Sequence, residues 1–240
     1  MINSGFLLIN KPIGKSSYGC IGYIKYIAQQ KLRIGHAGTL DPFASGLLII
    51  ALGREATRLL PQCMAMEKTY VAKGKCGELT DTLDRTGAIV ATSDTMPSEQ
   101  VLRQSLDSFG SSYEQIPPLY SALKHQGRPM YLLARNKLID QEQLQEIADA
   151  KRRTIQLYKK QFLSYEPPYF TIQVRVSQGT YIRTLVNDIA VQAGSCATTY
   201  ELVRTAIGPF TLADAVDLHA ITSIDDLNAR IIPSDLFFKQ

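Results

Sequence analysis

The chain has 240 residues, of which 45% are hydrophobic and 20% are charged. This is the composition of an ordinary globular protein, and it excludes a disordered or fibrous chain. The longest apolar runs, FLLI and LLIIAL, are far shorter than the roughly 20 residues that cross a bilayer, so we expect no membrane segment. The net charge of +4 permits a polyanionic partner but does not demonstrate one.

The four cysteines are scattered without a CxxC pair, and the chain has only three histidines. Metal sites and disulfide frameworks need closer or patterned spacing. No signal peptide is expected, because Lys11 follows the first apolar stretch instead of preceding it. We therefore expect reduced thiols, a cytoplasmic protein and no metal site.

Alternation and apolar spacing predict the first elements along the chain. Strands are expected at residues 6–9, 47–52 and 69–76. Ser16 or Ser17 can cap a helix with apolar residues at positions 20, 24, 27 and 28. Residues 31–45 contain two glycines and a proline, and we expect an ordered loop there.

In the second half, helices are expected at residues 99–109, 140–153 and 180–193, and a strand is expected at residues 170–176. Gly194 stands where the glycine after a helix belongs. The middle helix ends in the basic triplet Lys151, Arg152 and Arg153, which is typical of an RNA contact or of a solvated helix face. The proline-rich residues 110–135 are expected to be irregular. Strands mixed with helices, without a regular βαβ alternation, predict an α+β fold.

The stretch GHAGTLDPFASGLL, residues 35–48, holds the first candidate for chemistry. Gly35 and Gly38 allow close approach of the backbone to a ligand. Pro42 forces the preceding Asp41 out of any helix, so that its carboxylate projects from a rigid loop, as a nucleophile or base requires. The alternative is a turn aspartate that only caps its own loop.

The second candidate is Arg183, in the first turn of the helix expected at residues 180–193. A cation there opposes the helix dipole, which predicts an anionic partner, either a phosphate or a carboxylate such as Asp41. The alternative is an exposed arginine that water tolerates.

Four tyrosines with lysine or arginine nearby could stack on nucleic-acid bases: Tyr70, Tyr120, Tyr131 and Tyr181. A strand tyrosine such as Tyr70 is more often part of a core. The pair Asp81 and Asp84 could bind a metal, but no third ligand accompanies it.

Five segments together resemble the TruB family of tRNA pseudouridine synthases. In chain order they are GFLLINKPIGKSS, GHAGTLDPFASGLLIIALGREATR, KTYVAKGKCGELTDTLDRTG, PPLYSALKHQGRPMYLLAR and SQGTYIRTLVNDIA. The resemblance extends from Gly5 to about Phe210. The resemblance implies an isomerase that converts uridine to pseudouridine at position 55, in the T-loop of tRNA. It also implies base flipping, nucleophilic catalysis by an aspartate and no cofactor.

The resemblance further implies which residues act. Asp41 is the implied nucleophile, Tyr70 the active-site tyrosine, and Arg183 the residue that orients Asp41. The implied substrate-binding residues are His36, Tyr70, Tyr181, Leu202, Lys124 and Arg128. Where many family members have paired arginines, this chain has Val203 before Arg204.

The implied fold is the pseudouridine synthase catalytic fold, an α+β domain with a mixed, largely antiparallel sheet and flanking helices. It is expected over residues 1–212, with an RNA-binding thumb insertion at about 121–153. Residues 213–240 are expected to form a short C-terminal extension and not a complete PUA domain. The expected partner is tRNA, through its T-arm, with no membrane and no obligatory protein partner, so the chain is expected to be a monomer.

Two other functions stay open. One is the related catalytic subunit of guide-RNA pseudouridylation complexes. The other is a non-catalytic tRNA chaperone that uses the same basic surface, although a chaperone has no need of a carboxylate such as Asp41 directed at the RNA.

Overall fold

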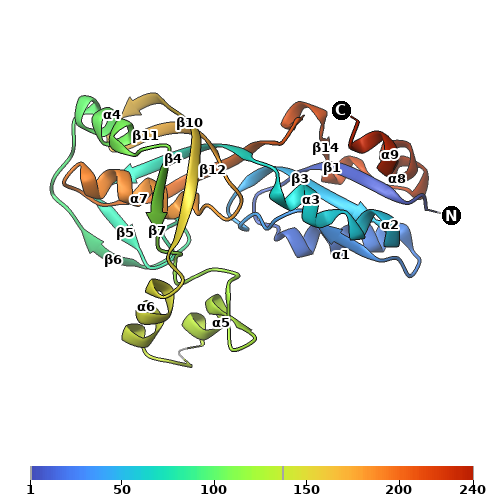
Figure 1. Cartoon of the computed structure of the whole chain (residues 1–240), viewed down its shortest axis with the longest axis horizontal. Helices are drawn as coiled ribbons and strands as arrows, with labels where there is room; N and C mark the ends of the chain where they lie inside the picture. Colours follow the sequence, from blue (N-terminus) through green and yellow to red (C-terminus); the bar gives the residue numbers. More distant parts are fainter. Residues whose placement is uncertain (1, 137, 240) are drawn as a thin grey trace. The chain divides into compact units, whose positions relative to one another are not determined.

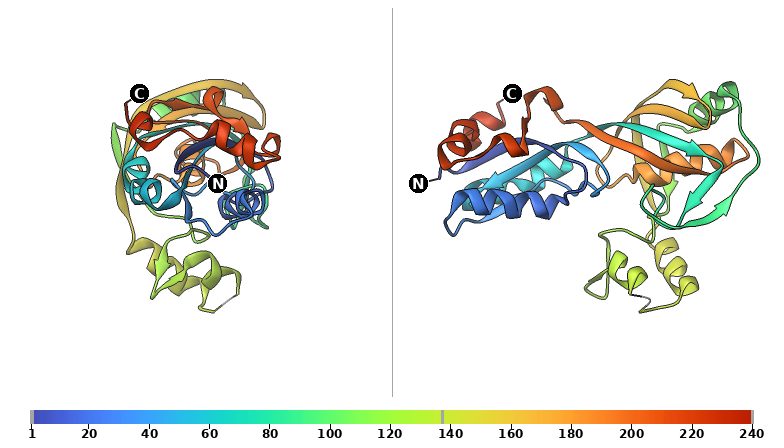
Figure 2. Two further views of the ribbon diagram at one scale, coloured as in Figure 1. Left: turned by 90° about the vertical axis from the view of Figure 1, so that its right-hand side faces the viewer. Right: turned by 180° about the vertical axis from the view of Figure 1, so that it is seen from behind.

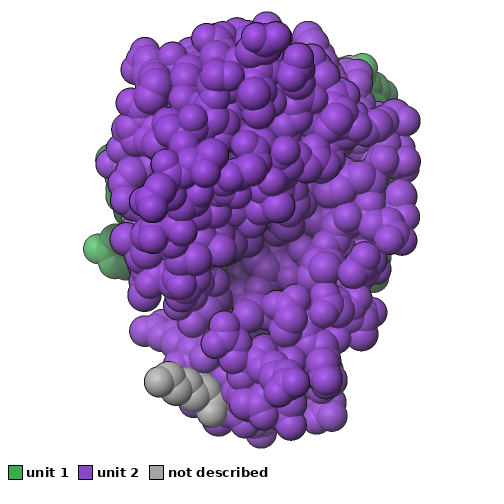
Figure 3. Space-filling model, turned by 90° about the vertical axis from the view of Figure 1, so that its left-hand side faces the viewer, with its two compact units in different colours: residues 1–70, 202–240 green, residues 71–201 purple. Residues whose placement is uncertain are grey.

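The computed structural model describes residues 2–136 and 138–239. The chain divides into two compact units, and Figure 3 colours them separately: unit 1 has residues 1–70 and 202–240, and unit 2 has residues 71–201. Two strands, β4 (Lys68–Cys76) and β12 (Ala197–Ile207), have residues in both units. The domain boundary expected at residue 212 stays a prediction.

Unit 1 is a mixed sheet with helices on its faces (Figure 1). Strand β1 pairs antiparallel with β3 and parallel with β14, and β12 lies parallel on the other side of β3. The short β2 and β13 pair antiparallel with β3 and β12. Besides β4 and β12, its elements are β1 (Gly5–Lys11), α1 (Ser17–Ala28), β2 (Ile34–His36), β3 (Ser45–Leu52), α2 (Gly53–Arg58), α3 (Leu60–Ala65), β13 (Phe210–Thr211), β14 (Val216–Asp217), α8 (Ile224–Arg230), α9 (Ser234–Phe237) and two short 3₁₀ turns, Leu212–Asp214 and Leu218–Ala220.

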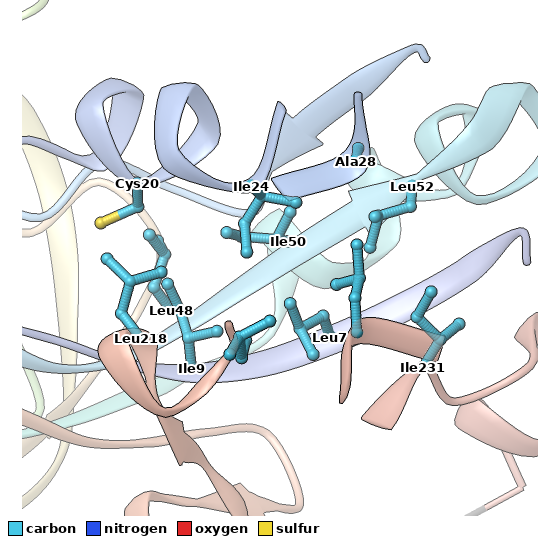
Figure 4. Packing of buried hydrophobic residues seen from close by; sticks show 12 residues of the cluster. Leu7, Ile9, Cys20, Ile24, Ala28, Leu48, Ile50, Leu52, Leu218 and Ile231 are labelled. Atoms are coloured by element: carbon cyan, nitrogen blue, oxygen red, sulfur yellow. The ribbon is translucent and has the colours of Figure 1, made fainter. Parts of the chain in front are cut away.

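One hydrophobic core of unit 1 lies between α1 and the strands β1 and β3, and a second one contains Phe6, Leu47 and Phe237. Figure 4 shows the apolar side chains of α1 directed toward those of the two strands. Burial of these side chains removes apolar surface from water and so fixes the position of α1 on the sheet. The labelled residues are Leu7, Ile9, Cys20, Ile24, Ala28, Leu48, Ile50, Leu52, Leu218 and Ile231.

Unit 2 is built on an antiparallel arrangement of long strands. The strand order is β4, β11, β10 and β7, and both β10–β11 and β10–β7 are antiparallel. Helix α7 (Ile182–Gln192) lies within the residues 180–193 where a helix is expected, and Gly194, two residues after its end, has φ +78°. The further elements are β5 (Glu78–Thr80), β6 (Ile89–Thr92), α4 (Glu99–Ser108), β7 (Ser112–Gln115), β8 (Lys124–His125), β9 (Arg128–Pro129), α5 (Met130–Arg135), α6 (Gln141–Asp149), β10 (Arg153–Glu166), β11 (Tyr169–Val176) and α7 (Ile182–Gln192).

The expected α+β class and the mixed, largely antiparallel sheet are confirmed. The segment expected as a thumb carries the β8–β9 hairpin and the helices α5 and α6. In Figures 1 and 2 these helices lie apart from the long strands of unit 2. No helix in residues 2–136 and 138–239 is long and apolar enough to cross a membrane.

The expectation that a helix continues to residue 153 is wrong. Helix α6 ends at Asp149, and Arg153 is the first residue of β10. The helical reading fails because residues 153–157 alternate in burial as a strand paired with β7, and strand pairing satisfies their backbone groups. The basic triplet is therefore not one face of a helix.

Candidate active site

Asp41 lies in the loop between β2 and β3, and the backbone on both sides of it is held. On one side, the buried hydroxyl of Ser17 accepts from the N–H of Leu40 (2.9 Å) and donates to its carbonyl (3.1 Å). On the other side, the N–H of Gly14 donates to the carbonyl of Pro42 (2.7 Å). The loop is therefore rigid at the residue whose carboxylate is the candidate nucleophile, as the sequence predicts.

A fully buried arginine supports the same loop from β12. The guanidinium of Arg204 donates to the carbonyls of Leu47 (2.8 Å), Gly38 (3.3 Å) and Thr39 (3.5 Å). Its backbone lies so close to Gly46 that a Cβ there would come within 2.3 Å of the Arg204 carbonyl oxygen, and Gly46 has φ +112°. Only glycine fits this close approach. Arg204 thus fixes both ends of the Asp41 loop.

The two serines of the first helix divide their roles. Ser16 is the N-cap of α1 and accepts from the N–H of Gly19 (2.9 Å), whereas Ser17 serves Leu40. We predict that Ser17→Ala lowers the free energy of unfolding by about 1–3 kcal/mol, because two buried backbone groups lose their partner, and that it also slows turnover. Ser16→Ala should cost about 1 kcal/mol and leave turnover unchanged. Urea unfolding and rate measurements on both variants would check this, and equal turnover in the two would contradict it.

Buried cations shape the electrostatics around the loop. Lys11 is fully buried, and its ammonium donates to the carbonyls of Pro12 (2.8 Å) and Lys15 (2.6 Å). Burial lowers the pKa of Lys11 to about 8, while the charges of Cys20 and Asp41 raise it. The Asp41 carboxylate therefore interacts with a cation of its own unit.

His36 is the last residue of β2. Burial lowers the pKa of this imidazole, the charge of Arg204 lowers it further, and a backbone hydrogen bond with Gly38 opposes the shift. An imidazole with a pKa below 6.5 is mainly neutral at pH 7. The His36 ring is therefore mainly uncharged at pH 7.

The remaining predicted residues of unit 1 lie in strands. Tyr70 is in β4 and is 9% exposed, and Leu202 is in β12 and is 5% exposed. Both have the burial of core residues, so a stacking role for Tyr70 rests on the family resemblance.

In unit 2, Arg183 is the second residue of α7 and is buried. Its guanidinium donates to the carbonyls of Thr82 and Tyr120, the latter at 2.9 Å, and lies 3.7 Å from the carboxylate of Asp84. Asp84 is itself buried and accepts from the N–H of Thr86 (2.9 Å). These acceptors offset the cost of a cation at the positive end of a helix dipole. The alternative of an exposed, solvated Arg183 is wrong.

Tyr181 directly precedes α7, and the guanidinium of Arg153 lies over its ring in a cation–π contact, 4.9 Å from the ring centroid. Arg153 thus covers an aromatic ring at the start of β10 instead of standing in a solvated row with Lys151 and Arg152. Arg152 lies 3.7 Å from the carboxylate of Glu114. Lys124 and Arg128, on β8 and β9, are both exposed.

Unit 2 is hollowed on the face shown in Figure 3. The structure has a cavity of about 920 Å³ in this unit, lined by the β5–β6 region, by residues 116–120 and by α6. Tyr120 lines it and donates through its hydroxyl to Asp81 (3.2 Å). Asp81 therefore accepts a hydrogen bond from Tyr120, and Asp84 pairs with Arg183. The part of the chain that the structure describes holds no group of three or more His, Cys, Asp or Glu side chains suited to a metal.

Asp188 of α7 is a partly buried carboxyl that accepts from the hydroxyl of Tyr113 (3.4 Å). Burial raises the pKa of Asp188 to about 6 and also raises the pKa of Tyr113. Because the folded state holds this proton more tightly than the unfolded state, the stabilisation is complete below pH 4 and is lost as the pH rises through 6. We predict that the stability of the wild type relative to Asp188→Asn falls by up to about 3 kcal/mol between pH 4 and pH 7. Urea unfolding across this range would check it, and a constant difference would contradict it.

Sequence reasoning missed three residues that support the site. Ser17 was a candidate only as a helix cap, Asp84 only as a metal ligand, and Arg204 carried no local signal. Asp41, His36, Tyr70 and Leu202 belong to unit 1, whereas Lys124, Arg128, Tyr181 and Arg183 belong to unit 2.

Comparison with known proteins gives one consistent result. The family model described as TruB family pseudouridylate synthase (N terminal domain) matches residues 25–182. Proteins named tRNA pseudouridine synthase B from Syntrophotalea carbinolica and Bordetella avium are 42% and 41% identical over 91% and 95% of this chain, which spans 68% and 91% of their lengths. A chain in the crystal structure of a Cbf5–Nop10–Gar1 complex is similar with TM-score 0.70 and 27% identity, over 95% of this chain and 60% of that one. The resemblance seen in the motifs is confirmed: the chain belongs to the TruB family of pseudouridylate synthases.

Proposed function

We propose that this chain converts uridine to pseudouridine at position 55, in the T-loop of tRNA. The observation that carries the proposal is the rigid presentation of Asp41, whose neighbours Leu40 and Pro42 are both held through backbone hydrogen bonds. A carboxylate on an immobilised loop is suited to nucleophilic attack, because little freedom is lost on reaching the reacting geometry. Relatives named tRNA pseudouridine synthase B, at 34–42% identity, support tRNA as the substrate.

In the proposed reaction the bond between N1 of uracil and C1′ of ribose breaks, and a bond between C5 and C1′ forms. The proton on C5 is lost and N1 gains one, so the product is an isomer and no oxidant or reductant is consumed. Asp41 attacks either C1′ or C6 and holds the intermediate. Tyr70 stacks on the uracil and assists removal of the C5 proton, and Arg183 orients Asp41.

The target uridine has to leave its loop before this chemistry, as base-modifying enzymes require. We assign His36 and Leu202 to the flipped nucleotide, with Leu202 lining the uracil pocket. The exposed Lys124 and Arg128 contact phosphates of the T-arm, which adds affinity without sequence choice.

The test is incubation with an unmodified tRNA transcript tritiated at C5 of uracil. Release of tritium, followed by mapping of the modified position to 55, would support the proposal. Binding without release would favour the chaperone, and release only on addition of a guide RNA would favour the guide-dependent function. Modification at another position would contradict the T-loop assignment.

The thumb contacts predict a specific salt dependence. Lys124→Ala combined with Arg128→Ala should weaken tRNA binding and reduce the slope of log K against log salt by about 1.4–1.8, since each phosphate contact contributes about 0.7–0.9. The rate at saturating tRNA should stay unchanged. Arg230→Ala combined with Lys239→Ala removes the same charge from exposed positions of unit 1 and is the matched control. Equal slopes for the two double variants would contradict the assignment.

A further inference from the structure

The side-chain amide of Gln115 is bonded to both backbone groups of Tyr181. Gln115 is the last residue of β7 and is 1% exposed. Its Oε1 accepts from the N–H of Tyr181 (2.8 Å), and its Nε2 donates to the carbonyl of Tyr181 (3.0 Å). The second proton of Nε2 is donated to the hydroxyl of Tyr113 (2.7 Å). Every donor of the amide is used, so its orientation is fixed, because a flipped amide would set donor against donor.

The bonded residue stands at the start of α7. Tyr181 is the N-cap position of that helix, and its side chain makes no capping hydrogen bond. Its carbonyl also accepts the first helical bond, from the N–H of Leu185 (3.2 Å). The Gln115 amide, which belongs to strand β7, therefore holds the backbone at the start of a helix whose own N-cap side chain makes no capping hydrogen bond.

The chain that follows β7 also binds Arg183. Five residues after Gln115, the carbonyl of Tyr120 accepts from the guanidinium of Arg183 (2.9 Å). Arg153, the register partner of Gln115 across the β7–β10 pair, lies over the ring of Tyr181. The C-terminal end of β7 thus holds the backbone of Tyr181 through Gln115. The residue paired with Gln115 on β10, Arg153, contacts the ring of Tyr181.

We propose that Gln115 is a positioning residue for the reaction: its amide fixes the backbone at Tyr181 and thereby the placement of the Tyr181 ring and the Arg183 guanidinium. This rests on the proposed function, in which Arg183 orients Asp41, and on the substrate-binding role that the family resemblance implies for Tyr181. Without the amide, the N–H and carbonyl of Tyr181 and the hydroxyl of Tyr113 lose a partner, and the first turn of α7 is free to shift.

The first variant is Gln115→Met, which keeps the length of the side chain and removes its hydrogen bonds. Hydrogen exchange at the Tyr181 amide should accelerate at least about tenfold. The single-turnover rate at saturating tRNA should fall at least about tenfold, with the dissociation constant for tRNA within about threefold. This split between rate and binding separates positioning from general loss of affinity.

The matched control is Ser105→Ala. Ser105 is buried in α4 and donates to the carbonyl of Ile189 (2.6 Å), so it holds the opposite end of α7. This variant should lose stability without accelerating exchange at Tyr181 and without slowing the single-turnover rate. An equal loss of rate in Ser105→Ala would overturn the proposal, because any weakening of α7 would then suffice.

The second variant, Gln115→Glu, tests rescue. The carboxylate can accept from the N–H of Tyr181 but cannot donate, whereas the carboxylic acid can donate one hydrogen bond. The charged groups facing it are Asp188, reached through Tyr113, and Arg153. The rate of Gln115→Glu relative to that of the wild type should rise as the pH is lowered from 8 to 6. If Gln115→Met does not fold, this pH dependence alone tests the positioning role. A pH profile parallel to that of the wild type would overturn the proposal.

The two proposals fail differently. If the wild type modifies tRNA and Gln115→Met accelerates exchange but keeps a rate within twofold, the positioning role is wrong and the proposed function stands. If the wild type does not modify the T-loop, the proposed function is wrong, and the role of Gln115 in the reaction is wrong with it.

Discussion

Asp41→Asn should abolish pseudouridine formation, with less than about a thousandth of the wild-type rate remaining, as is typical when a catalytic group is removed. An amide cannot replace a carboxylate that forms a covalent intermediate. The loop should keep its shape, because Ser17, Gly14 and Arg204 hold it through backbone groups and not through the carboxylate. The dissociation constant for tRNA should therefore stay within a few-fold of the wild type.

The measurement combines tritium release with a binding assay and a thermal unfolding curve. Asp94→Asn, which neutralises an exposed carboxylate of unit 2, is the control and should have the wild-type rate. Residual turnover in Asp41→Asn above about a thousandth of the wild-type value would contradict the nucleophile assignment.

Arg183→Lys should lose most of the activity although the positive charge is kept. Arg183 is 4% exposed, and its planar guanidinium donates to the carbonyls of Thr82 and Tyr120 while it lies 3.7 Å from the carboxylate of Asp84. A single ammonium cannot reproduce this arrangement. At least one buried acceptor would lose its partner, at a cost of about 1–3 kcal/mol. If that whole cost falls on the transition state, the rate falls by about 5- to 150-fold.

Two measurements separate catalysis from folding in this variant. Unfolding by urea reports the loss of stability, and the single-turnover rate is then measured where the variant is fully folded. Asp84→Asn is the informative companion, because it keeps the size of the side chain and its hydrogen bonding while removing the negative charge near Arg183. Near-normal rates in Arg183→Lys would show that the guanidinium geometry does not matter for the reaction.

Local pattern in the sequence was sufficient for much of the fold. The helix α1 begins at Ser17 after its Ser16 cap, α7 ends before Gly194, and the strands β3, β4 and β11 lie where apolar runs and alternation predict them. These elements carry their signal within a dozen residues, as caps and periodic burial do. The loop around Asp41 was also predictable, because Pro42 and its glycines restrict the backbone locally.

Only the tertiary structure showed the bounds of the strands β10 and β12 and the roles of Ser17, Asp84 and Arg204. The alternation of β10 is interrupted by Lys159 and Lys160, at a place where its register against β11 shifts, so its period is hidden in the sequence. Arg204 donates to a carbonyl 157 residues earlier, and Arg183 donates to one 101 residues earlier. Such contacts have no sequence period, because a buried guanidinium is stable wherever folding brings enough oxygen acceptors around it. The sequence thus determined the rigid loop, the candidate nucleophile and the family, whereas packing between distant segments decided what holds them in place.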